Sequence, residues 1–155
     1  KGKTPGDTYK WMVDAGVLIY EQVVHPKNMK VRIFLKGSEA ARLSLIPSMI
    51  VMGASGHRTY GHHKRILPGK ENLCVVKRMS LIKKTRVKSL FYRGEHRSLK
   101  EVAFYQADEL HIHFNQRLPL QLDGEIVWLL AQHSPLILRL CPPLLPVLKS
   151  SSHLS

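Results

Sequence analysis

Short apolar segments separated by turn residues recur along the whole sequence, and this feature limits the fold more than any other. Each segment has about the length of a strand, with Gly, Pro, Asn or Asp between one segment and the next. Such spacing is typical of all-β sandwiches and barrels rather than of βαβ arrays. We therefore expect a mainly β fold, an antiparallel β-sandwich or barrel-like domain with one or two short helices. The nine predicted strands begin at Trp11, Met29, Leu45, Glu71, Lys100, Glu109, Leu118, Glu125 and Pro135.

One segment has a helical period instead. Between Ser80 and Gly94 the apolar residues recur about every 3.6 positions, and the intervening face is rich in Lys and Arg. Ser80 is a good cap for the start of a helix, and Gly94 is a good residue to end it. The pattern predicts a helix here with a strongly positive outer face.

Residues 53–72, "GASGHRTYGHHKRILPGKEN", contain four glycines, three histidines and several basic residues without apolar periodicity. We expect a long irregular loop. In a compact domain such a loop is usually functional or disordered.

The chain is strongly basic: 24 Lys and Arg against 11 Asp and Glu give a formal charge of +13. This charge favours an anionic partner such as nucleic acid, anionic lipid or a phosphorylated ligand. Aromatic residues make up 7% of the chain and do not interleave with the basic runs. That distribution disfavours a stacking surface for nucleic acid.

The organisation that we expect is a flexible segment over residues 1–10, one domain over 11–148 and a disordered tail over 149–155. The sequence shows neither a secretory signal nor an apolar run long enough for a membrane-spanning helix. Cys74 and Cys141 lie in apolar segments, which favours two buried thiols over a disulfide. Because the first residue is Lys1 rather than Met, we expect a piece of a longer protein.

Common catalytic and metal-binding motifs do not occur. His62 and His63 are adjacent and His111 and His113 share a strand face, but no cysteine lies at a zinc-ligand spacing from them. Neither the G-x-S-x-G nucleophile motif nor a phosphate-binding P-loop is present. The histidines are thus expected to face solvent or phosphate.

Acidic residues are few, and two of them flank a glycine in Asp123-Gly124-Glu125. Asp-Gly is common in two-residue hairpin turns, so a turn explains the local pattern. Glu125, however, begins a very apolar strand, where a carboxylate is costly unless it faces a polar cleft. The residues by themselves allow both a turn and a catalytic carboxylate.

Three segments taken together resemble the C-terminal β-sandwich domain of the diacylglycerol kinase-like lipid kinases. This family comprises bacterial diacylglycerol and YegS-type kinases and, more distantly, sphingosine and ceramide kinases. The segments are "MIVMGASGHRTYGHHKRILPGKENLCVV", with a glycine-rich loop; "LFYRGEHRSLKEVAFYQADELHI", with a Gly-x-His turn; and "LPLQLDGEIV", with the Asp-Gly-Glu motif. The resemblance covers about residues 29–147.

The resemblance implies ATP-dependent phosphorylation of a diacylglycerol-like or sphingoid alcohol. Glu125 would be the general base on the lipid hydroxyl, and Asp123 would support the turn. It also implies a Mg²⁺ ion held by the Glu71 carboxylate and the carbonyls of Pro68 and Leu73. In this stretch the chain is shorter than the family and has Glu71-Asn72 where the family has Asp-Gly.

The family binds ATP in an N-terminal domain with a Gly-Gly-Asp-Gly-type motif, which this sequence lacks. The resemblance therefore implies a lipid-binding, base-supplying lobe that is inactive alone. Its expected partners are a lipid substrate, an anionic membrane surface and the nucleotide-binding domain of the same protein, with a homodimer left open. The expected location is the cytoplasm, peripheral at the membrane. The alternative is a basic β-domain that binds nucleic acid or another polyanion without catalysis.

Overall fold

The computed structural model describes residues 27–60, 64–122 and 125–141, and over these residues the fold is mainly β, with antiparallel sheets and one α-helix, as predicted. The elements are β1 (Met29–Leu35), β2 (Ser38–Leu45), β3 (Pro47–Met52), β4 (Arg58–Tyr60), β5 (Lys64–Leu67), β6 (Leu73–Lys77), α2 (Leu81–Arg93), the 3₁₀ turn η1 (His96–Ser98), β7 (Val102–Tyr105), β8 (Glu109–His113), β9 (Leu118–Leu122), β10 (Glu125–Leu129), the 3₁₀ turn η2 (Ala131–His133) and β11 (Leu136–Arg139).

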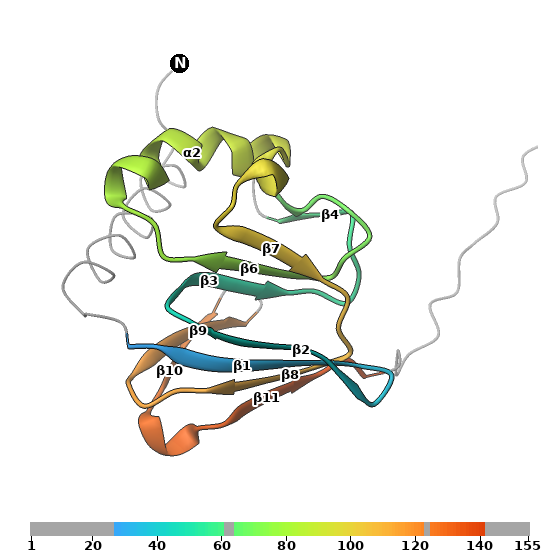
Figure 1. Ribbon diagram of the computed structural model, residues 1–155, viewed down its shortest axis with the longest axis vertical. Coiled ribbons are helices and arrows are strands. Elements are labelled where there is room, and N and C mark those ends of the chain that lie inside the picture. Colours follow the sequence, from blue (N-terminus) through green and yellow to red (C-terminus); the bar gives the residue numbers. More distant parts are fainter. Residues whose placement is uncertain (1–26, 61–63, 123–124, 142–155) are drawn as a thin grey trace, which may run out of the picture.

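The strands form two larger sheets and two ribbons. One sheet has the order β11-β8-β1-β2, the other has the order β3-β6-β7, and the ribbons pair β9 with β10 and β4 with β5. In Figure 1 the four-stranded sheet lies below the three-stranded sheet, and α2 lies above both. The described part of the chain is therefore layered as sheet, sheet and helix.

The central strand β6 joins two cores. Leu73 and Val75 pack with Val31, Ile33 and other residues in the core between the sheets. On the opposite face of the strand, a second core under α2 includes the buried Cys74, Val76 and Val87. Because both faces are covered, β6 is apolar without alternation, which is the pattern of a strand buried on both sides.

Helix α2 begins and ends where the sequence predicts. The Ser80 side chain accepts a hydrogen bond from the backbone N–H of Lys83 at 3.3 Å. Gly94 has a φ of 76°, a left-handed conformation that glycine adopts without strain, and its N–H donates to the carbonyl of Leu90.

The structure corrects two expectations of the strand pattern. Strand β2 was not predicted, because its sequence "SEAARLSL" is polar and exposed at the sheet edge. It follows a tight turn in which Lys36 and Gly37 have positive φ values of 52° and 76°. Residues 53–72 were expected to be irregular, yet they contain the ribbon β4–β5. The strand predicted from Trp11 lies outside the described residues.

The cysteines differ from each other. Cys74 is buried and burial raises its pKa to about 12. Cys141 is exposed, so the expectation of two buried thiols is wrong for this residue, and both thiols are free. Within the described residues, no helix has both the length and the apolar character needed to cross a membrane.

Candidate functional site

The hairpin of β9 and β10 carries Glu125, the residue predicted to be the general base. In the register of the two strands Glu125 lies opposite Leu122, Val127 opposite Leu120, and Leu129 opposite Leu118. Residues directly opposite each other in an antiparallel pair share a face. Glu125 therefore lies on a face that is otherwise made of aliphatic residues.

This face changes from buried to exposed along the hairpin. Leu118 and Leu129, at its base, pack against the core between the sheets. Further along, Val127 is 45% exposed and Leu122 is 52% exposed, and the Glu125 side chain is exposed as well. The result is an apolar surface that starts at the core and ends at a carboxylate.

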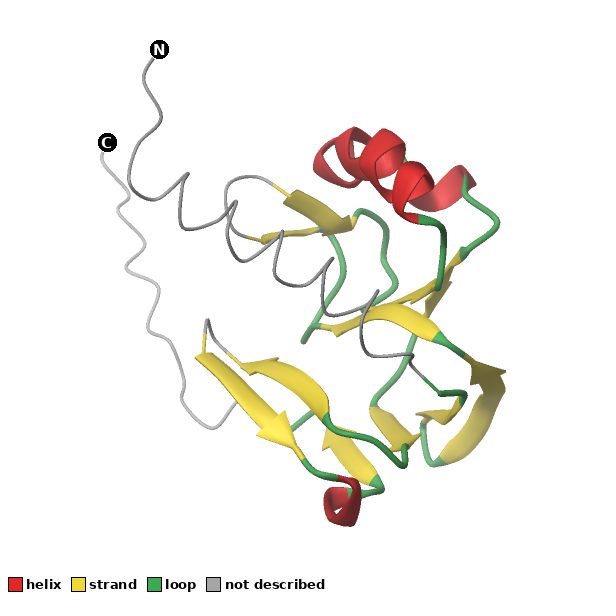
Figure 2. Ribbon diagram, turned by 90° about the vertical axis from the view of Figure 1, so that its left-hand side faces the viewer, coloured by secondary structure: helices red, strands yellow, loops and turns green. Residues whose placement is uncertain are grey.

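The opposite face of the hairpin is mostly apolar, with Gln121 opposite Ile126 and Pro119 opposite Trp128. It carries Ile126, 50% exposed, and Trp128, 40% exposed. The guanidinium carbon of Arg117 lies 4.4 Å from the centroid of the Trp128 ring, a cation–π geometry. Figure 2 shows this hairpin as the two strands interrupted by the short grey trace and followed by η2.

A two-stranded ribbon with exposed apolar residues on both faces is unusual on a protein surface. Contiguous apolar patches of this kind usually mark contact with a ligand, a membrane or a protein. Together with the exposed carboxylate of Glu125, the hairpin could hold an apolar molecule and accept a proton from its polar end. Asp123, the predicted supporting acid, lies outside the described residues.

Glu71, predicted to hold Mg²⁺ together with the carbonyls of Pro68 and Leu73, has an arginine as its partner. The Glu71 carboxylate is paired with Arg97, with Oε2 2.5 Å from Nη2 and Oε1 3.2 Å from Nη1. Leu73 lies in the central strand β6 opposite Met52 and Tyr105, where backbone carbonyls accept hydrogen bonds from the neighbouring strands. The Glu71 carboxylate is thus already paired with a cation and does not fit the predicted metal. Among the described residues, no three or more His, Cys, Asp or Glu side chains lie together in a group that could hold a metal ion.

The Glu71–Arg97 pair lowers the pKa of Glu71, chiefly through the hydrogen bond from Arg97, and raises the pKa of Arg97 by the same contact. The guanidinium carbon of Arg97 also lies 4.8 Å from the centroid of the Phe104 ring. Arg97 therefore joins the loop before β6 to a side chain of β7.

Asn72 holds the same loop from the other side. Its amide nitrogen donates to the carbonyls of Ala107 at 2.7 Å and Gly53 at 3.1 Å, and its amide oxygen accepts from the N–H of Ala107 at 2.9 Å. The side chain is completely buried, so these bonds satisfy a polar group that would otherwise be costly to bury. We did not predict a role for Asn72 or Arg97, because neither residue belongs to a recognisable local motif.

His96, of the Gly-x-His turn, is a buried structural residue. Its Nε2 lies 3.1 Å from the carbonyl oxygen of Ile66, its Nδ1 lies 3.4 Å from that of Leu90, and its ring stacks on Phe91 with centroids 4.3 Å apart. Burial lowers its pKa, although the two carbonyls act in the opposite direction. Because a neutral imidazole carries one N–H, the shorter contact to Ile66 is the better hydrogen bond.

His111, one of the two histidines of β8, has an acidic partner. His111 contacts the Glu109 carboxylate, which is also paired with Arg139. His62 and His63 lie outside the described residues. The structure therefore brings His111 to an acidic partner rather than to another histidine.

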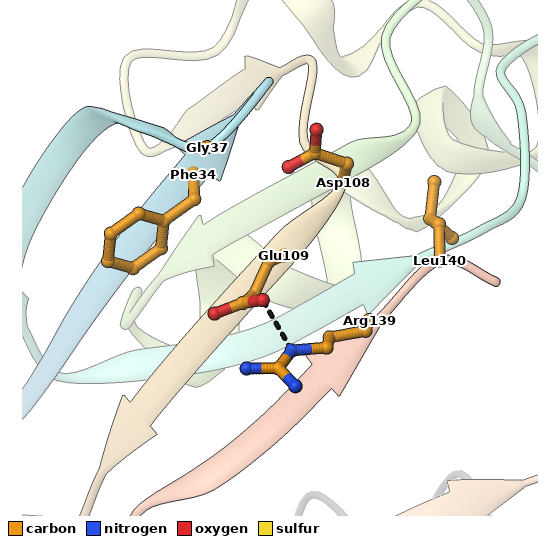
Figure 3. Close-up of a pocket in the computed structure, with 6 residues that line it drawn as sticks. All are labelled: Phe34, Gly37, Asp108, Glu109, Arg139 and Leu140. Atoms are coloured by element: carbon orange, nitrogen blue, oxygen red, sulfur yellow. Dashed lines mark hydrogen bonds and ion pairs between the residues drawn. The ribbon is translucent and has the colours of Figure 1, made fainter.

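An open recess lies beside Glu109, at the end of β1, β8 and β11. It has a volume of about 470 Å³ and is lined by Phe34, Gly37, Asp108, Glu109, Arg139 and Leu140, and Figure 3 shows Glu109 and Arg139 pointing toward each other in it. Its charged groups already have partners: Asp108 accepts from the N–H of Lys36 at 2.5 Å, and Arg139 holds the pKa of Glu109 below its usual value. None of the predicted site residues lines this recess.

The predicted basic face of α2 is partly used within the fold. Lys83 makes an ion pair with Glu101 at 2.5 Å, and burial lowers the pKa of Lys84. Arg86 and Lys88 are exposed on the same helix. The helix thus adds positive charge to the surface while one of its lysines fastens it to the loop before β7.

No known protein-family model matches this chain, and no curated protein sequence matches it either. The resemblance to lipid kinases therefore stays a prediction based on three segments. Among the features described above, the hairpin that presents Glu125 bears most directly on function.

Proposed function

We propose that this chain is the lipid-binding, base-supplying lobe of an ATP-dependent lipid kinase that acts on a diacylglycerol-like or sphingoid alcohol. The observation that carries the proposal is the β9–β10 hairpin, on which an exposed carboxylate, Glu125, ends an apolar face continuous with the core. A lipid alcohol has matching chemistry, since a hydroxyl group lies at one end of a long apolar body.

In the proposed reaction the lipid hydroxyl oxygen attacks the γ-phosphorus of ATP. The bond between that phosphorus and the β,γ-bridging oxygen breaks, ADP leaves, and Glu125 takes the hydroxyl proton. Leu120, Leu122 and Val127 would hold the adjoining apolar part of the lipid by excluding water from it. ATP and its Mg²⁺ would be bound by a nucleotide-binding domain outside these 155 residues, as the resemblance implies.

The charge of the chain supports a site at an anionic membrane. The formal charge is +13, and a cation near an anionic lipid surface contributes about 1 kcal/mol to attachment. Trp128 and Arg117 form a pair of the kind that suits the boundary between headgroups and acyl chains, since an indole has an apolar body and a polar N–H. The proposed location is therefore peripheral, at a membrane surface.

The direct test is Glu125→Gln in a natural protein that contains this chain together with a nucleotide-binding domain. Transfer of radiolabelled phosphate from ATP to diacylglycerol or sphingosine in vesicles should fall about 10²–10⁴-fold, the usual contribution of a general base. Binding to the same vesicles should not change. The matched control is Glu95→Gln, which neutralises an exposed glutamate next to Arg93 and should leave transfer intact.

Two results would count against the proposal. Full transfer by Glu125→Gln would remove this residue from the role of base. Salt-sensitive binding of the 155-residue chain to oligonucleotides, without preference for anionic vesicles, would favour the alternative of a polyanion-binding domain.

A further inference from the structure

We propose that the guanidinium of Arg97 is a built-in cation for the loop before β6 and replaces the Mg²⁺ ion that the lipid-kinase resemblance implies there. That Arg97 holds this loop does not depend on the proposed function, whereas its replacement of a metal rests on the lipid-kinase resemblance. The proposal predicts a domain whose folding is independent of divalent cations.

The geometry of the pair is that of a two-point clamp. Both nitrogens at the end of Arg97 face the carboxylate of Glu71, at 2.5 Å and 3.2 Å. Such paired contacts between Arg and a carboxylate fix direction as well as distance. The Glu71 carboxylate is thus already compensated by a positive charge at ion-pair distance.

Arg97 covers one of the two carboxylate oxygens. Oε2 of Glu71 is buried in the folded chain and has no hydrogen bond of ordinary angular geometry, so its close contact is the ion pair with Arg97. The two side chains are 32% and 44% exposed, so removing the guanidinium would leave a partly exposed carboxylate without its partner. Another cation could then take the place of the guanidinium.

The backbone makes room for the clamp at Gly69. A Cβ atom at this position would lie 2.4 Å from Oε2 of Glu71 and 2.8 Å from Nη2 of Arg97. Any larger residue would therefore push both groups of the pair away from the loop. The guanidinium of Arg97 also lies over the Phe104 ring.

The clamp fixes more than one loop. The carbonyl of Gly69 accepts a hydrogen bond from the N–H of His57, and the carbonyl of Asn72 accepts one from Gly53, both at 2.8 Å. A Cβ atom on Gly56 would lie 2.1 Å from the carbonyl oxygen of Gly69. The glycine-rich segment 53–57 therefore rests directly on the segment that Arg97 holds.

The test is the melting temperature of the purified 155-residue chain in EDTA and in millimolar MgCl₂, at matched ionic strength. The original chain should melt at the same temperature in both. Arg97→Gln should lower Tm by about 2–6 °C, and MgCl₂ should restore part of the loss. Arg93→Gln is the control, because it removes an arginine from the more exposed pair with Glu95 and should respond little to either condition.

Three outcomes would overturn the proposal. A Tm of the original chain that rises with MgCl₂, and stops rising in Glu71→Gln, would mean that a metal binds in spite of Arg97. An unchanged Tm in Arg97→Gln would mean that the clamp does not stabilise the loop. A lower Tm without any response to MgCl₂ would make the contact an ordinary ion pair rather than a substitute for a metal. Should Arg97→Gln fail to fold, the Tm of the original chain in EDTA and in MgCl₂ still tests whether a divalent cation stabilises the fold.

Discussion

Strands β6 and β10 have similar apolar sequences, "LCVVK" and "EIVWL", and opposite surroundings. Residues 73–76 of β6 are at most 3% exposed, whereas residues 126–128 of β10 are at least 40% exposed. β6 has a strand on each side and is covered by a sheet below and by α2 above, while β10 pairs, among the described strands, only with β9. An apolar run thus indicates a strand, but the neighbours decide whether it builds the core or offers a surface for contact.

The largest expected difference between these strands is in stability. Leu73→Ala removes a completely buried side chain and should lower the free energy of unfolding by about 2–5 kcal/mol. Leu122→Ala, on the exposed part of the hairpin, should change it by no more than about 0.5 kcal/mol. Urea unfolding of both variants measures the two values. Equal losses of unfolding free energy in the two variants would contradict this difference, because they would mean that the hairpin face is part of the core.

A smaller effect is expected in membrane binding, and here the hairpin should matter. Ile126→Ser should weaken binding to vesicles with anionic lipid about fivefold, because the side chain would no longer bury apolar surface in the bilayer interface. Ile137→Ser is the matched control, since Ile137 is similarly exposed but lies on β11 opposite His111. Sedimentation with vesicles compares the two. An equal loss in both variants would show that general surface hydrophobicity, rather than this hairpin, is responsible.

The smallest effect is a pH dependence of stability that we assign to a buried histidine. The pKa of His96 is lowered from its ordinary 6.5, so between the two values the unfolded chain binds more protons than the folded one. The stabilisation that depends on a neutral, buried His96 is therefore complete above about pH 6.5. It is lost as the pH falls from there toward the lower pKa of His96 in the folded state.

Unfolding experiments between pH 5 and pH 7.5 measure this dependence. His96→Gln should be less stable throughout but flatter with pH, because the group that takes up the proton is gone. Ile137→Ser, an exposed substitution that removes no titratable group, should keep the slope of the original chain. If the slope survives in His96→Gln, another group is responsible for it.

Much of the fold could be predicted because it depends on local periodicity and on turn residues. The alternation in "ELHIH" places Leu110 and Ile112 in the core, and Ser80 and Gly94 delimit α2 by their own chemistry. Strand β2 could not be predicted in this way, since an exposed edge strand needs little apolar periodicity. The turn residues Lys36 and Gly37 were its available signal.

The candidate site, too, could be predicted only in part. The position of Glu125 at the start of an apolar strand is visible in the sequence, and the strand that follows it is present. The predicted metal ligands were implied by the resemblance to lipid kinases, and the resemblance could not indicate that Arg97, 26 positions later, would meet the Glu71 carboxylate. Long-range ion pairs depend on how η1 packs against the loop, which no local pattern encodes.

Local sequence was enough to predict most of the strands, both ends of helix α2 and the basic character of the chain, because propensity, capping and charge are properties of neighbouring residues. Tertiary packing was needed to show that β6 is enclosed while β10 is open, and that Arg97 faces Glu71. Those outcomes depend on which layers pack against each face of a strand, and this packing is formed by contacts between residues far apart in the chain.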